Sequence, residues 1–241
     1  MSSLLKEIEM KNLQKTGGIA ALYLAAAYLV GIVLFLFVLD YPNITDPLQK
    51  VNLLVEKQAI MYATNLILYV IFGFFLIVLL LALYERLKTG AQTIMRLAAV
   101  IGIIWAGSLI ASGMVSNAGI APTVALYGSD PAQAALTWQG IEIVASGLGN
   151  GNGEILGGVM TLLVSWAALR TGGFSKILNY LGLVVGVVGI VSTIPGLNDL
   201  TGVFGMSQII WFVWLAIILL RPVSNEMPGA HRQGLSLTKA P

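Results

Sequence analysis

Residues 147–158 read G-L-G-N-G-N-G-E-I-L-G-G and lie inside a long apolar segment bounded by Trp138 and Arg170. Glycine weakens a helix because it loses more backbone freedom on folding than any other residue. The stretch also contains Glu154, the acid that is placed deepest within an apolar segment. We interpret it as a weakened, partly polar transmembrane helix that faces the interior of a helical bundle.

The composition of the chain points to a membrane protein. Of its 241 residues, 57% are hydrophobic and 10% are charged, whereas soluble domains carry about 25% charged residues. The apolar runs reach the ~20 residues that a helix needs to cross the hydrocarbon core of a bilayer. They are continuous rather than alternating, which favours helices over a barrel. The predicted fold class is therefore all-α, a polytopic membrane helical bundle.

The apolar runs predict six transmembrane helices in one domain. They cover about residues 17–39, 58–84, 93–117, 136–169, 177–194 and 203–220. The fourth run is longer than one span requires, which leaves room for an interfacial or re-entrant piece at residues 136–147. An outer loop is expected at residues 40–57. The transmembrane domain, residues 17–221, is expected between a polar N-terminal lead, residues 1–16, and a disordered tail, residues 222–241.

The basic residues predict the orientation of this bundle. Six spans place both termini and the turns at 85–92 and 170–176 on one side of the membrane. Of the 13 Lys and Arg residues, only Lys50 and Lys57 then lie on the other side. The positive-inside rule assigns the basic side to the cytoplasm. We expect a multi-pass protein of the plasma (cell inner) membrane with both termini inside.

Polar residues inside the apolar segments predict a pocket. With Arg170 at the inner boundary, Glu154 lies 16 residues, or about 24 Å, further along a helix. A carboxylate at such a depth is costly unless it is protonated, hydrogen-bonded or hydrated. Other helices carry polar groups at a similar depth, whereas the cytoplasmic half has few. The predicted outward-facing ligand or ion pocket comprises Glu154, Asn150, Asn152, Asn65, Ser112, Ser116, Asn117 and Gln208.

The glycines support a second interpretation, close packing between helices. Gly149, Gly153 and Gly157 recur every four residues and would form one smooth helix face. Gly182 and Gly186 offer a matching groove on the fifth helix. In this interpretation Glu154 and the asparagines hold helices together by hydrogen bonds. The tryptophans are expected to anchor the bundle at the interface or to fill its interior.

The residue inventory excludes several kinds of chemistry. The chain has no cysteine, and its single histidine, His231, follows the last apolar run. Thiolate catalysis, Cys-ligated metals and a Ser-His-Asp triad in the membrane are therefore excluded. Glu142 and Glu154 would lie about 18 Å apart on one continuous helix, too far for joint acid–base work. We expect no catalytic residue, metal site or cofactor.

Two functions remain open at this point. The first is a small-solute or ion binding or transport module with a polar pocket around Glu154. The second is a structural or accessory membrane subunit that docks partner helices through its glycine faces. The expected partners are the lipid bilayer, a small ligand or cation, and a homo- or hetero-oligomer, but no nucleic acid.

Four segments together resemble a known family. They are G-G-I-A-A-L-Y at 17–23, G-E at 153–154 leading to L-R-T-G at 169–172, Y-L-G-L-V at 180–184, and Q-I-I-W-F-V-W-L at 208–215. Their order resembles an uncharacterised prokaryotic family of integral membrane proteins, domain of unknown function four-three-eight-six. The resemblance implies a bacterial or archaeal plasma-membrane protein and supplies no catalytic residues.

Overall fold

The computed structural model describes residues 3–149, 151 and 153–221. Within these ranges the secondary structure is helical and contains no strand, which confirms the predicted all-α fold. The helices, which include two π-helices and one 3-10 helix, follow in the order α1 (Ser3–Ile32), η1 (Val33–Val38), η2 (Tyr41–Asn43), α2 (Pro47–Asn65), η3 (Leu66–Ile71), α3 (Phe72–Tyr127), α4 (Pro131–Leu148), α5 (Ile155–Thr171), α6 (Lys176–Val191) and α7 (Leu200–Leu220).

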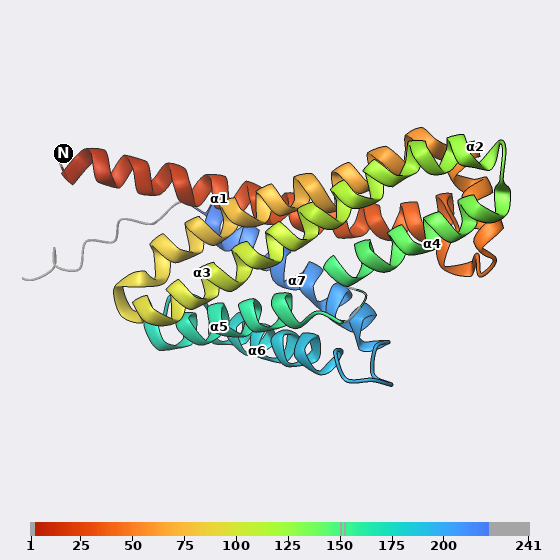
Figure 1. Ribbon diagram of the computed structural model, residues 1–241. Helices are drawn as coiled ribbons and strands as arrows, with labels where there is room; N and C mark the ends of the chain where they lie inside the picture. Colours follow the sequence, from red (N-terminus) through yellow and green to blue (C-terminus); the bar gives the residue numbers. More distant parts are fainter. Residues whose placement is uncertain (1–2, 150, 152, 222–241) are drawn as a thin grey trace, which may run out of the picture.

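The helices run along one long axis and reverse at its two ends (Figure 1). The chain leaves the N-terminal end in α1 and returns through α2, η3 and the first part of α3. Ala91 breaks α3 with φ −145° and ψ 40°, so residues 92–127 run outward again. α4 and α5 then lead back toward the N-terminal end, and α6 and α7 complete the bundle beside them.

Two hydrophobic cores are stacked along this axis. The larger one joins α1, α3, α5 and α7 and includes fully buried Leu76, Leu83 and Phe212. The smaller one lies at the end opposite the N-terminus, where Val51 and Leu54 of α2 meet Trp138 of α4. We call these the bundle core and the outer core. The polar cavity described below lies where they meet.

Several helices have the length and apolarity that a membrane requires. The segments Met10–Val38, Pro47–Tyr127 and Leu200–Leu220 are long and apolar enough to cross a bilayer, whereas α5 and α6 are apolar but only 17 and 16 residues long. Large apolar side chains also cover the outside of the bundle; Phe37 is 77% exposed and Ile177 is 70% exposed. Such a surface fits hydrocarbon. The number of crossings, six, stays a prediction.

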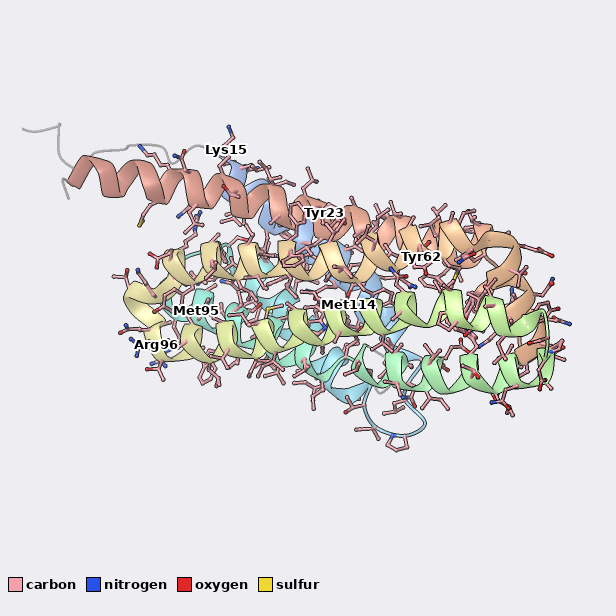
Figure 2. The ribbon with its side chains drawn as sticks, turned by 45° about the horizontal axis from the view of Figure 1, so that its top comes forward. Lys15, Tyr23, Tyr62, Met95, Arg96 and Met114 are labelled. Atoms are coloured by element: carbon pink, nitrogen blue, oxygen red, sulfur yellow. The ribbon has the colours of Figure 1, made fainter. Side chains whose placement is uncertain are left out.

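The distribution of basic residues follows the predicted pattern along the axis. Figure 2 shows Lys15 and Arg96 at the N-terminal end of the bundle, whereas Tyr62 lies toward the other end. Lys50 and Lys57 belong to α2 in the outer half. Which end faces the cytoplasm stays a prediction of the positive-inside rule.

The predicted outer loop, residues 40–57, is wrong over most of its length because α2 already begins at Pro47. The Asp46 side chain accepts a hydrogen bond from the Leu48 N–H, and Pro47 occupies the first helical turn. Both are strong helix-start signals. Helices likewise extend past the predicted boundaries at residues 17, 84 and 117, since α1 begins at Ser3 and α3 continues through 85–90 and on to Tyr127.

The predicted fourth helix, residues 136–169, is also wrong, because the segment forms two helices: α4 ends at Leu148 and α5 begins at Ile155. Gly149 leaves the helical region with φ −85° and ψ −119°, and Gly153 has a φ of +86°, a value that L side chains rarely adopt. Asp130 starts α4 by accepting a hydrogen bond from the Gln133 N–H. The glycine-rich stretch therefore interrupts the helix instead of only weakening it.

Candidate functional site

A cavity of about 770 Å³ lies at the junction of the two cores. It is lined by residues of α2, η3, α3 and α4, together with Phe35 of η1 and Tyr41 of η2. Its volume falls within the range of small-molecule sites, about 300–1,000 Å³. Its polar lining residues are Tyr41, Lys50, Asn65, Tyr69, Ser112, Ser116, Trp138, Gln139, Glu142 and Ser146. We call it the outer cavity.

An ion pair crosses the outer cavity from α2 to α4. Lys50 Nζ lies 2.9 Å from Glu142 Oε1 and 3.1 Å from Oε2, and both side chains are slightly more than one-fifth exposed. These are the single cation and the single carboxylate among the residues that line the cavity. Their charges cancel, so the cavity presents both signs of charge and no net charge.

Aromatic side chains hold this ion pair in place. The Tyr41 hydroxyl donates a hydrogen bond to Glu142 Oε1 and accepts one from Trp138 Nε1 at 3.0 Å. The Lys50 ammonium lies 5.0 Å from the centre of the Tyr41 ring, within the range of a cation–π contact. The pair is thus fixed from three elements, which limits the side-chain motion that weakens exposed ion pairs.

The environment of Tyr41 keeps its hydroxyl neutral. Burial raises the pKa of the Tyr41 phenol well above its ordinary value of 10.0, and the hydrogen bond to Glu142 and the negative charge of that carboxylate raise the pKa further. A phenolate beside Glu142 would place two negative charges together. Tyr41 therefore acts as a hydrogen-bond donor at physiological pH.

Neutral hydrogen-bonding groups also line or support the outer cavity. Asn65 Nδ2 donates to Asn117 Oδ1 at 3.0 Å, and Asn117 Nδ2 donates to the Tyr62 carbonyl at 3.3 Å. The buried Ser112 hydroxyl donates to the Ala145 carbonyl at 2.7 Å. These bonds connect α2 to α3, and α3 to α4. Ser116 also lines the cavity.

The structure divides the predicted pocket residues between different places. Asn65, Ser112 and Ser116 line the outer cavity, and Asn117 supports it through Asn65. Glu154 lines a separate cavity. Gln208 is fully buried elsewhere, where its amide and the Thr161 hydroxyl are hydrogen-bonded at 3.2 and 3.3 Å. Asn150 and Asn152, like His231 and the tail at 222–241, lie outside the described residues.

Glu154 faces a smaller cavity of about 300 Å³, here called the inner cavity. The residue precedes α5 and is only 5% exposed. Its N–H donates to Ser192 Oγ at 3.0 Å, and Ser192 in turn donates to the Gly189 carbonyl, so the start of α5 is tied to the end of α6. The two cavities are neighbours, since Phe35 and Tyr69 line both.

Both shared residues belong to π-helices, Phe35 to η1 and Tyr69 to η3. A π-helix carries an extra residue per turn and frees backbone groups, and it is frequent at functional sites. Here the Ile67 carbonyl of η3 accepts a hydrogen bond from the Tyr23 hydroxyl of α1. The π-helices therefore direct aromatic side chains into the space between the cavities.

The glycines predicted to share one helix face are separated by the break. Gly149 and Gly153 stand in the connection, where Gly153 lies against the backbone of Ser192 and Thr193, and only Gly157 is helical. Gly157 lies against Trp105 and Phe204. Gly182 lies against Ser165 and Trp211, and Gly186 lies against Leu162 and Gly158. The expected continuous face at 149, 153 and 157 is therefore incorrect, and the helical glycines contact other helices of the same chain.

The sequence interpretation missed Lys50, Glu142, Tyr41 and Trp138 as members of one site. The sequence predicts an outer loop at 40–57 that includes Lys50, and it places Glu142 on the same continuous helix as Glu154. The pairs Asp46-Pro47 and Asp130-Pro131 were the signals that could have corrected this, since each marks a helix start. They predict that Lys50 and Glu142 lie near the starts of two helices at the same end of the molecule. They do not predict that the two side chains meet.

The described residues contain no group of three His, Cys, Asp or Glu side chains that could hold a metal ion. The polar groups of the outer cavity instead suit a ligand that accepts and donates hydrogen bonds. No family model, curated protein or solved structure matches the chain. The resemblance to the uncharacterised membrane family therefore stays a prediction.

Proposed function

We propose that this chain is a multi-pass plasma-membrane protein that binds a small polar solute without net charge, such as a zwitterion, in the outer cavity. The observation that carries the proposal is the Lys50–Glu142 pair inside a cavity of about 770 Å³. A zwitterion can place its anion toward Lys50 and its cation toward Glu142 and leave the cavity neutral, whereas a singly charged solute would add a net charge to it.

The neutral wall of the cavity supports the same class of ligand. Asn65, Ser112 and Ser116 offer hydrogen-bonding groups, and Trp138 and Phe35 offer apolar surface. Ligand sites typically combine a few placed polar groups with such apolar walls. A solute with a short apolar part between or beside its charges fits this lining.

The bundle below the cavity supports binding from one side in this state. Leu76, Leu79 and Leu83 of α3 and Phe212 of α7 are fully buried in the bundle core, so side chains fill the interior toward the N-terminal end. Transport to the other side would require a second conformation. Transport of the bound solute is an extension of this proposal, and a measurement of solute flux across the membrane would test it.

The glycine faces give the second function, docking of partner helices, no specific support. Gly158, Gly186 and Gly189 already bring α5 and α6 together, since a Cβ on Gly158 would lie 2.7 Å from the Gly186 carbonyl oxygen. These glycine faces already contact other helices of the same chain. A partner would have to dock on another surface.

Thermal unfolding of the purified protein in a neutral detergent tests the proposal. The probes are a panel of amino acids and betaines, matched with carboxylates and amines that carry only one of the two charges. We expect saturable stabilisation by members of the zwitterionic set, in line with the linkage between binding and stability. The double variant Lys50→Gln/Glu142→Gln should abolish it.

The chain offers a matched control for this variant. Lys88 and Glu85 form another ion pair, three residues apart on α3 near the Ala91 turn and far from the cavity. The variant Glu85→Gln/Lys88→Gln should retain the full response. Stabilisation that survives removal of Lys50 and Glu142, or a response only to singly charged solutes, would contradict the proposal.

A further inference from the structure

The inner cavity has a lining unlike that of the outer cavity. Its walls include the rings of Tyr28, Phe35, Tyr69, Phe72 and Trp105 together with Glu154. Aromatic rings from α1, η1, η3 and α3 surround the space, and the single charged group among these residues is the Glu154 carboxylate. The cavity therefore combines an apolar, aromatic interior with one fixed acid.

The carboxylate shares the cavity with two tyrosine rings. Glu154 lines it together with Tyr28, from α1, and Tyr69, from η3. Phe72 meets Trp105 edge-on at 6.2 Å between ring centres and meets Tyr28 edge-on at 5.5 Å. Such edge-to-face contacts are a preferred arrangement of aromatic pairs.

We propose that the inner cavity is a second binding site, which takes a small lipophilic organic ammonium ion between the Glu154 carboxylate and the rings of Tyr28, Tyr69, Phe72 and Trp105. Aromatic faces attract organic cations, and the attraction grows when water is excluded. Glu154 supplies the opposite charge, so the buried cation would be paired.

Two alternatives fit the same lining less well. An inorganic cation such as Ca²⁺ requires several oxygen ligands, whereas Glu154 is the single carboxylate among the residues that line the cavity. A neutral hydrocarbon would fill the apolar part of the cavity but would make no use of the carboxylate that lines it. The ammonium ion uses both parts of the site.

The position of the cavity indicates how such a ligand enters. Leu36 lines the cavity and is 49% exposed, and it belongs to the apolar segment Met10–Val38 that is long enough to cross a membrane. An entrance beside Leu36 would open toward lipid. An amine with apolar substituents concentrates there, whereas a strongly hydrated solute does not.

The test uses the full chain in a neutral detergent, with benzyltrimethylammonium as the probe and neopentylbenzene, its uncharged carbon analogue, as the comparison. Tryptophan fluorescence reports binding because Trp105 lines the cavity. We expect saturable binding of the cation, weaker binding of the analogue, and a loss of affinity of about tenfold or more in Glu154→Gln.

Glu56→Gln is the matched control, because Glu56 is exposed on α2 and bonded only to Asn52 at 2.8 Å in the described structure. It should bind the cation as the wild type does. Should Glu154→Gln fail to fold, Tyr28→Leu provides the second variant, which keeps an apolar wall but removes one ring. It should weaken binding of the cation and not of neopentylbenzene.

Equal affinity of the wild type and Glu154→Gln for the cation would overturn the proposal, as would an analogue that binds as tightly as the cation. Unchanged cation binding by Tyr28→Leu would do the same. None of these results depends on Lys50 or Glu142. The proposal for the inner cavity is therefore tested independently of the proposal for the outer cavity.

Discussion

Gly153 lies at the closest backbone approach in the connection between α4 and α5. Its φ is +86°, and a Cβ at this position would lie 2.7 Å from the Ser192 carbonyl carbon and the Thr193 nitrogen. This contact places Glu154 against Ser192 and starts α5. The position therefore needs glycine for two reasons, conformation and space.

Gly196 has only the first of these two requirements. Its φ is +88°, but no heavy atom lies within 4 Å of the place that an added Cβ would take. We predict that Gly196→Ala lowers the free energy of unfolding by about 1–2 kcal/mol, the cost of the left-handed backbone. Gly153→Ala should cost a further ~1–3 kcal/mol, because backbone atoms must move. Denaturation in detergent measures both, and equal losses would show that the close approach is absent.

Tyr41 gives a prediction about pH. Because the pKa of the folded-state phenol is raised above the ordinary 10.0, the unfolded state loses this proton first as the solution becomes alkaline. Its stabilising contribution is therefore complete below pH ~10 and falls as the pH rises beyond that value. The advantage of the wild type over Tyr41→Phe in unfolding temperature should be constant at neutral pH and shrink above pH ~10. A difference in unfolding temperature between the two proteins that does not change with pH would contradict the raised pKa of Tyr41.

At the scale of the elements, the residues that start α2 and α4 position the two helices that supply Lys50 and Glu142 to the outer cavity. Asp46 and Asp130 each cap the first turn of a helix, with hydrogen bonds of 3.0 Å from Leu48 N–H and Gln133 N–H. Lys50 stands one turn into α2, and its N–H bonds to the Asp46 carbonyl. The cap therefore fixes the helix from which Lys50 reaches Glu142.

Replacing either cap should destabilise the outer half of the molecule. We predict that Asp46→Ala and Asp130→Ala each lower the free energy of unfolding by about 0.5–2 kcal/mol. Asp199 also precedes a helix, α7, but its side chain makes no capping bond. Asp199→Ala should therefore have a smaller effect. A loss as large in Asp199→Ala would show that charge near a helix end, rather than capping, is responsible.

Sequence patterns were sufficient for the existence and order of most elements. Continuous apolar runs predicted an all-α chain, and Arg170 with Gly172 marked the end of α5 correctly to within two residues. They did not reveal the break before α5, because glycine tolerates both a weak helix and a positive φ, and neighbouring atoms such as those of Ser192 decide between them.

The site was predicted only in part, for a similar reason. Asn65, Ser112 and Ser116 were recognised because a polar side chain in an apolar run is conspicuous. Lys50 and Glu142 were not recognised. The sequence around a charged residue near a loop is the same whether its side chain is solvated or paired with a residue 92 positions away. Their meeting is a property of tertiary packing between α2 and α4.

At the scale of the whole molecule, the proposed function requires one arrangement: a bundle that crosses a membrane, with its basic N-terminal end toward the cytoplasm and the outer cavity open to the other side. The long second half of α3 is consistent with this, since residues 92–127 would extend about 54 Å as a helix, beyond the ~30 Å hydrocarbon core. The outer core would then stand above the membrane and carry the cavity.

The absence of cysteine from the chain allows a direct measurement of this arrangement. Single cysteines at Gln139, which is exposed and lines the outer cavity, and at Thr89, exposed near the Ala91 turn, can be labelled in intact cells with a membrane-impermeant maleimide. We predict that Gln139→Cys is labelled at once and that Thr89→Cys is labelled only after the membrane is permeabilised. Labelling of both residues in intact cells, or the reverse pattern, would contradict the account.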